Sequence, residues 1–154
     1  KQYGLRYNIE FLPWAGVRNL QEAITLIDAL ARDNVYIMVD TLHAGRAGVT
    51  AEELARTNPK YFNFIHLCDG PAGPDGDPVL DNIKDDLMLF TARECRLYTG
   101  DGVMDIAGMV KALPNIPLSI ELPNLENISK YGVAGHARNC IEKAKAYFKA
   151  NGIE

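Results

Sequence analysis

The segment Val35–Asp40, VYIMVD, constrains the fold more than any other part of the sequence. Both of its alternating faces are largely apolar, which is typical of a parallel strand that is covered on both sides. The strand nevertheless ends on a carboxylate, Asp40, and His43 follows three positions later. A charge at the end of a buried strand needs a partner, and a metal ion is one of the few groups that can serve. The segment therefore predicts a parallel α/β sheet with a polar site at the ends of its strands.

Length and composition exclude several classes of protein. With 154 residues, of which 47% are hydrophobic, the chain can bury the core of one soluble domain. Its net charge of −4 offers no basic surface for nucleic acid or an anionic membrane, and no apolar run is long enough to span a bilayer. The three cysteines, Cys68, Cys95 and Cys140, lack CxxC spacing, which favours a reducing, cytoplasmic location over a disulfide framework.

The same strand-like pattern recurs three more times along the chain. The segments are Arg6–Leu12, Phe62–Asp69 and Pro117–Leu122. Helical spacing predicts helices that begin after Asn19, run from Thr50 to Asn58, from Asp105 to Leu113, and over roughly Val133–Ala150. A Gly-containing loop is expected after His43, and a long Pro/Gly/Asp-rich loop leads into Asp81–Cys95, a stretch that can hold a short helix.

The order of elements is therefore a strand and a helix repeated four times, which means a parallel sheet with helices packed outside it. Four such units can form an open doubly wound sheet or half of an eight-unit TIM barrel. The charged strand ends favour the half barrel, because a barrel builds its active site from several strands that converge at the carboxyl-terminal rim.

Four side chains carry the predicted chemistry: Glu10, Asp40, His66 and Glu121 each lie at or near the end of a separate strand. Each lies on the face opposite its strand's apolar stripe, so in a barrel all four point inward. Any one of them alone is more simply a strand-end carboxylate or a hydrogen-bonded histidine, but four in register favour a common site. His43 is a weaker candidate, because it lies just beyond the strand and a hydrogen bond to a loop carbonyl could be its only role.

Three carboxylates cannot lie close together without a neutralising charge, because like charges at short range raise one another's pKa. A divalent cation resolves this conflict. The oxygen-rich donor set favours Mn²⁺, with Mg²⁺, Co²⁺ or Zn²⁺ as alternatives. The remaining histidine, His136 in the final helix, is expected to be a surface or packing residue.

Several motifs resemble the xylose isomerase-like TIM-barrel superfamily of sugar and sugar phosphate isomerases and epimerases. They are IEF with Glu10, MVDTLH with Asp40 and His43, IHLCD with His66 and Asp69, RLYTGDGVMD from Arg96 to Asp105, and SIELPN with Glu121. The resemblance implies that Glu10, Asp40, His66 and Glu121 bind the catalytic metal and that His43 contacts substrate. The family loop often reads Pro-Gly-Glu-Gly where this chain has Thr-Gly-Asp-Gly. Relatives also place an arginine soon after the metal-binding histidine, a role that falls here to Arg93 or Arg96.

The resemblance covers residues 1–154 as the C-terminal half of such a barrel, with the first four strands absent. A half barrel leaves both outer strands unpaired, so the chain is expected to be a fragment, or else two halves pair in a homo-oligomer. The implied activity is isomerisation or epimerisation of a ketose through an enediolate, with Glu10 and Glu121 as base and acid.

Two other functions remain open at this point. One is a dehydratase of a keto-cyclitol or of dehydroshikimate that uses the same metal, and the other is a non-catalytic partial barrel that serves as an assembly or regulatory module. The DNA-repair endonuclease branch of the family is disfavoured, because its several zinc ions need more histidine than the three present and the net charge is negative.

Overall fold

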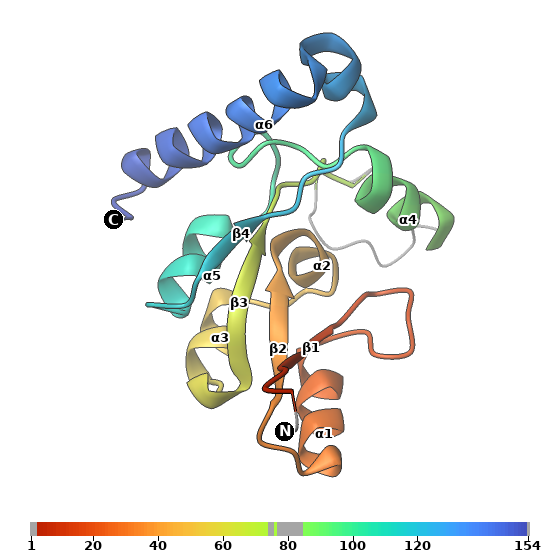
Figure 1. Ribbon diagram of the computed structural model, residues 1–154, viewed down its shortest axis with the longest axis vertical. Helices are drawn as coiled ribbons and strands as arrows, with labels where there is room; N and C mark the ends of the chain where they lie inside the picture. The colour runs from red at the N-terminus through yellow and green to blue at the C-terminus, as the bar shows by residue number, and fades with distance from the viewer. Residues whose placement is uncertain (1–2, 74–75, 77–84, 154) are drawn as a thin grey trace.

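A computed structural model describes residues 3–73, 76 and 85–153 and places four parallel strands in the order β1-β2-β3-β4 (Figure 1). The strands are β1 (Tyr7–Glu10), β2 (Val35–Asp40), β3 (Phe62–Leu67) and β4 (Leu118–Ile120). All three pairings are parallel, as the alternation of strands and helices predicts. Among the described residues, no further strand pairs with the outer edges of β1 and β4.

Six α-helices and one 3-10 turn are described around this sheet. They are α1 (Leu20–Leu30), α2 (Thr41–Arg46), α3 (Ala51–Arg56), η1 (Pro59–Tyr61), α4 (Asp85–Glu94), α5 (Ile106–Ala112) and α6 (Leu125–Ala150). Figure 1 shows α6 beyond the carboxyl ends of β2 and β3, at the opposite end of the sheet from α1. No helix in the described part of the chain is long and apolar enough to cross a membrane.

The hydrophobic core lies on the face of the sheet that carries the apolar stripes. Ile37 and Val39 of β2 and Ile65 of β3 are fully buried there. This leaves the other face, with Asp40 and His66, for the polar side chains. The stripe of β4 is different, because its side chains remain 37–40% exposed at the edge of the sheet.

The register of the strands brings their charged ends to the same edge of the sheet, in steps of two residues. Asp40 is paired with His66 across β2 and β3, while Glu10, the last residue of β1, is paired with Met38. Glu121 lies one residue beyond β4, and its amide nitrogen donates to the Leu67 carbonyl at 3.2 Å. The four polar strand ends therefore meet at the carboxyl edge of the sheet.

One expectation about the elements was wrong, and one was incomplete. The chain does not form a loop after His43, because Asp40 caps a helix, α2, that begins directly at the end of β2. The predicted helix over Val133–Ala150 is present, but α6 also contains an earlier helical segment, which begins at Leu125 with Asn124 as its cap and ends at a break at Gly132, where φ is +69°. Glycine tolerates this left-handed backbone, and sequence spacing alone showed only the part that follows it. Of the stretch 81–95, residues 81–84 lie outside the described residues, and α4 follows them.

Candidate metal centre

The four predicted side chains come together at one point. Glu10, Asp40, His66 and Glu121 each offer one donor atom, and these atoms all lie within 4.8 Å of one another. That spread is slightly larger than the span of about 4 Å between opposite ligands of a divalent ion. Three of the residues are partly buried and Asp40 is fully buried. The site is therefore shielded but open toward the inner face of the sheet.

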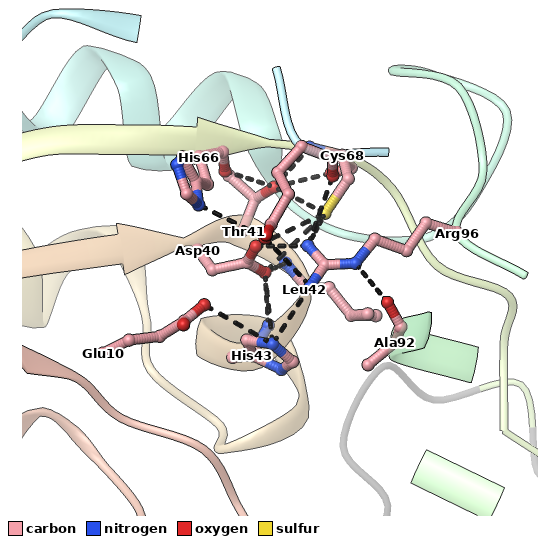
Figure 2. Close-up of polar contacts among 10 residues, drawn as sticks. Glu10, Asp40, Thr41, Leu42, His43, His66, Cys68, Ala92 and Arg96 are labelled. Atoms are coloured by element: carbon pink, nitrogen blue, oxygen red, sulfur yellow. Dashed lines mark hydrogen bonds and ion pairs between the residues drawn. The ribbon is translucent and has the colours of Figure 1, made fainter. Parts of the chain in front are cut away.

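Asp40 accepts hydrogen bonds both from the start of α2 and from Arg96 (Figure 2). Its Oδ1 accepts hydrogen bonds from the amides of Leu42 at 2.9 Å and His43 at 3.1 Å, which starts α2. Its Oδ2 accepts from Nη1 of Arg96. The Cys68 thiol makes longer contacts with both oxygens, at 3.6 and 3.8 Å, so a cation would share the Asp40 carboxylate with these donors.

The other three candidate ligands have donor atoms without hydrogen-bond partners among the described residues: Glu10 Oε1, His66 Nδ1 and Glu121 Oε2. His66 Nδ1 and Arg96 Nη2 lie 3.2 and 3.1 Å from Glu121 Oε2, yet neither contact has hydrogen-bond alignment. Buried polar atoms are nearly always satisfied, so three unsatisfied ones that face a common point fit a cation.

Arg96 enters this cluster from a segment that is fixed between two strand ends. Antiparallel bridges join Cys95 to Asn124 after β4 and Leu97 to Asp69 after β3. Asn124 Nδ2 also donates to the Arg96 carbonyl at 2.9 Å. The guanidinium of Arg96 is thereby held at the site from both sides, which sequence spacing could not show.

The charges of the site shift the pKa values of its groups. Burial, together with the like charges of Asp40 and Glu121, raises the pKa of Glu10 to about 7. Burial opposes ionisation of Asp40, but His43 and Arg96 hold its pKa below the ordinary value. Burial would also lower the pKa of Arg96, yet Asp40 and its other acidic neighbours raise it instead. Burial is the main cause of the raised pKa of Glu10, and the charges of Asp40 and Glu121 add more to it than Arg96 takes away.

His43, the predicted substrate contact, lies in α2 with only 2% of its side chain exposed. Burial lowers its pKa to about 4, so the ring is neutral near pH 7. Its Nε2 lies 3.3 Å from Nη2 of Arg96 and accepts from it, because arginine can only donate. Its Nδ1 then carries the hydrogen and has no partner among the described residues. The rings of His43 and Trp14 make an edge-to-face contact, with their centroids 5.0 Å apart.

The two predicted arginines are placed differently. Arg96 is buried at the cluster, whereas Arg93 lies on α4 with an exposed side chain. The structure therefore brings Arg96, and not Arg93, into contact with the candidate ligands Asp40 and Glu121.

Asp69 organises the loop that follows Arg96. Its two carboxylate oxygens accept hydrogen bonds at 2.9–3.0 Å from the amides of Gly70, Gly100, Gly102 and Met104. A Cβ at Gly102 would collide with the Gly70 carbonyl and the Asp69 carboxylate. The Thr-Gly-Asp-Gly motif is thus shaped by its close approach to this one carboxylate.

Several residues at the site were not predicted from the sequence. Thr41 Oγ1 accepts from the Cys68 amide at 3.0 Å and bonds the Cys68 carbonyl at 2.5 Å, which joins α2 to the end of β3. The Cys68 thiol donates to Asp40, and burial raises its pKa to about 12, so it remains protonated. Arg46 donates to the Pro71 carbonyl at 2.6 Å. The roles of Thr41 and Arg46 could have been recognised only from the helix that follows β2, and that segment was expected to be a loop after His43.

Comparison with known proteins identifies the class to which this fold and site belong. The family model described as xylose isomerase-like TIM barrel matches residues 1–148. The chain belongs to this family. The predicted fold, four strand-helix units that correspond to half of a barrel, is confirmed.

Individual relatives agree with this assignment. Inosose isomerase of Bacillus subtilis (strain 168) is 26% identical over 119 residues, which cover 76% of this chain and 38% of that protein. Inosose isomerase of Bacillus licheniformis is 25% identical over 156 residues and is covered to 51%. The chain thus spans about half, or less, of the curated relatives that it matches.

Solved structures share the fold. A structure of the IOLI protein with a bound zinc atom aligns with 97% of this chain and 51% of its own, with a TM-score of 0.77 and 23% identity. D-psicose 3-epimerase with D-tagatose from Clostridium cellulolyticum H10 aligns with 94% of this chain and 48% of its own, with a TM-score of 0.64 and 15% identity.

Proposed function

We propose that this chain supplies the catalytic residues of a divalent-metal-dependent isomerase or epimerase that acts on a sugar or sugar-derived ketose. The observation that carries the proposal is the convergence of Glu10, Asp40, His66 and Glu121 within 4.8 Å. Relatives named as inosose isomerases support the class of reaction. A neighbouring structure that holds zinc supports a metal in this fold.

The donor set is three carboxylates and one imidazole, which favours Mn²⁺ among the divalent ions, with Mg²⁺, Co²⁺ and Zn²⁺ as alternatives to be tested. When bound, such an ion would supply Lewis-acid polarisation of a substrate carbonyl, which makes the neighbouring C–H bond more acidic. Glu10, Asp40, His66 and Glu121 would hold it, because three of them present atoms that lack hydrogen-bond partners among the described residues.

Glu10 and Glu121 come from the two outer strands and therefore flank the site. One would remove the proton from carbon and the other would return it, through an enediolate. A pKa of about 7 for Glu10 suits proton exchange near neutral pH.

Substrate oxygens would be held by residues beside this pair. The Nδ1–H of His43 is a buried donor without a hydrogen-bond partner among the described residues, and it would bond a substrate oxygen. Arg96 would hold the carboxylates of Asp40 and Glu121 in place and would bind a substrate oxygen beside them. The exposed Arg93 has no role in this proposal.

The experiment combines metal content with solvent isotope exchange. Purified protein is loaded with Mn²⁺, and deuterium incorporation from solvent into a panel of ketoses is followed by NMR. We expect exchange at the carbon next to the carbonyl, its loss in Glu121→Gln, and no change in Glu126→Gln, an exposed glutamate of α6. Elimination from cyclic keto-acids without ketose exchange would instead indicate a dehydratase. A protein that holds Mn²⁺ but exchanges no ketose proton would contradict the proposal.

A further inference from the structure

The strongest unassigned feature is a buried histidine on the long helix behind the site. His136 of α6 is only 7% exposed. Its Nδ1 lies 2.9 Å from the Tyr98 hydroxyl, and its Nε2 lies 2.8 Å from the Leu122 carbonyl. The ring therefore joins the segments of Tyr98 and Leu122, which are 24 positions apart in the sequence. A role limited to surface or packing does not account for two directed hydrogen bonds.

The partners determine the protonation of the ring. A carbonyl can only accept, so Nε2 of His136 must carry a hydrogen toward Leu122. The Tyr98 hydroxyl then donates to Nδ1, so both nitrogens of the imidazole have hydrogen-bond partners. An apolar side chain would fill this place without the desolvation cost of burying a polar ring, so the hydrogen bonds are the specific contribution of histidine.

The two segments that His136 joins are those that carry Glu121, a candidate ligand and catalytic residue, and Arg96, which contacts it. Leu122 directly follows Glu121, and Tyr98 lies two residues after Arg96. Across the site, Arg96 Nη2 lies 3.1 Å from Glu121 Oε2, and its Nη1 donates to the Glu121 carbonyl at 3.3 Å. The two segments are thus joined directly, by the contacts between Arg96 and Glu121 and by the backbone bridge of Cys95 to Asn124, and again through His136.

We propose that His136 is a positioning residue that sets the geometry of Glu121 against Arg96, and through Glu121 both the affinity for the divalent ion and the rate of proton transfer. The proposal rests on the function proposed above. His136 touches none of the four candidate ligands, so its effect must travel through Leu122 and Tyr98. Mutation of groups that orient metal ligands without touching the metal commonly lowers metal affinity or activity by about 10- to 100-fold.

The test compares His136→Leu with His136→Gln in the full protein. Leucine removes both hydrogen bonds, whereas the glutamine amide keeps one donor and one acceptor. We expect His136→Leu to lower Mn²⁺ affinity, measured by titration calorimetry, and kcat by about tenfold or more, with a smaller change in KM. Tyr98→Phe should show part of this loss, and His136→Gln should recover most of it.

The matched control is Ala144→Gly, a buried position two turns further along α6. It should lower the melting temperature without changing Mn²⁺ affinity or kcat below the melting range. The positioning role is overturned if His136→Leu keeps both quantities within about twofold of wild type. It is equally overturned if Ala144→Gly, at the same loss of melting temperature, loses as much of either quantity as His136→Leu.

Failure of the proposed function is read separately. Wild-type protein that binds Mn²⁺ but turns over no ketose still reports the positioning role through the affinities of the variants. If wild type binds no divalent ion, the proposed function alone fails. The role of His136 is then decided by crystal structures of wild type and His136→Leu. Loss of the contact between Arg96 and Glu121 supports the role, and an unchanged contact overturns it.

Discussion

Arg96 donates from Nη1 to the carboxylate of Asp40, and both side chains are almost completely buried, at 5% and 0% exposed. The same guanidinium lies against Glu121. With Glu10, the site holds three carboxylates and one guanidinium, a sum of −2 when all are ionised. One divalent cation would bring this sum to zero, which is the state that a partly buried site tolerates best.

The pairing of Arg96 with Asp40 predicts a large loss of stability in Arg96→Met. Removal of one partner leaves the other charge buried and unpaired, which costs roughly 3–5 kcal/mol in the free energy of unfolding. The measurement is urea denaturation of metal-free protein. Saturating Mn²⁺ should reduce the loss, because a cation beside Asp40 partly replaces the guanidinium.

Arg93→Met is the control for this prediction, because Arg93 is exposed on α4. It should change the free energy of unfolding by less than about 0.5 kcal/mol. Equal unfolding curves for Arg93→Met and Arg96→Met would show that the ion pair with Asp40 does not stabilise the folded protein.

Glu10 predicts that metal affinity depends on pH. Its pKa is raised to about 7, so near pH 6 most of the metal-free protein carries a proton there. A cation must displace this proton, and affinity should therefore rise with pH up to about 7 and then level off. Calorimetry in two buffers of different ionisation enthalpy should find more protons released at pH 6 than at pH 8. Glu10→Gln should remove this difference, and a proton count that is the same at both pH values in wild type would contradict the assignment.

His43 predicts a pH effect of its own on stability. Burial lowers its pKa from 6.5 to about 4, so between these values the unfolded chain binds more protons than the folded one. The contribution of neutral His43 is fully present above about pH 6.5 and is lost as the pH falls toward 4. Glu10 acts in the opposite direction over a similar range, because its pKa is raised. The two effects partly cancel in wild type.

A variant separates these two contributions. The difference in unfolding free energy between wild type and His43→Gln should shrink from pH 7.5 to pH 5, as measured by urea denaturation. The same comparison with Glu10→Gln should change with pH in the opposite sense. If the difference for His43→Gln stays constant over this range, His43 does not titrate with a lowered pKa.

The candidate ligands could be predicted from the sequence because two local rules act together. Alternation along a strand assigns Asp40 and His66 to the same face, and parallel pairing then brings the strand ends to the same edge of the sheet. The first rule depends on residues close in sequence, and the second depends on the repeated strand-helix unit. They therefore held for Glu10 and Glu121 as well, although β1 and β4 are shorter than expected.

The surroundings of these ligands depend on contacts that local patterns do not encode. Arg93 and Arg96 are equivalent by spacing, and only the bridges of Cys95 and Leu97 to neighbouring strand ends decide which one enters the site. Helix α2 was missed because Gly45 indicated a loop. In the fold, a Cβ at Gly45 would meet the sulfur of Met104, so the glycine leaves room for this side chain within a helix.

Asp69 is the subject of the last prediction, which concerns the Thr-Gly-Asp-Gly loop, where the sequence differs from the usual family motif. Its carboxylate accepts hydrogen bonds from Gly100, Gly102 and Met104, and an ionised carboxylate accepts at both oxygens. In Asp69→Asn the amide group would face backbone donors with hydrogens of its own. At least one buried N–H then loses its acceptor, so the free energy of unfolding should fall by roughly 1–3 kcal/mol or more.

Asp101→Asn is the matched control, because it makes the same chemical change within the same loop. Asp101 contacts Lys143 at 2.7 Å, and both side chains are more than a third exposed. Exposed ion pairs contribute little, so this variant should cost less than about 1 kcal/mol in the free energy of unfolding. Because the loop is continuous with Arg96, Asp69→Asn should also weaken Mn²⁺ binding while Asp101→Asn should not. Equal effects of the two variants on stability and on binding would mean that Asp69 does not organise the loop.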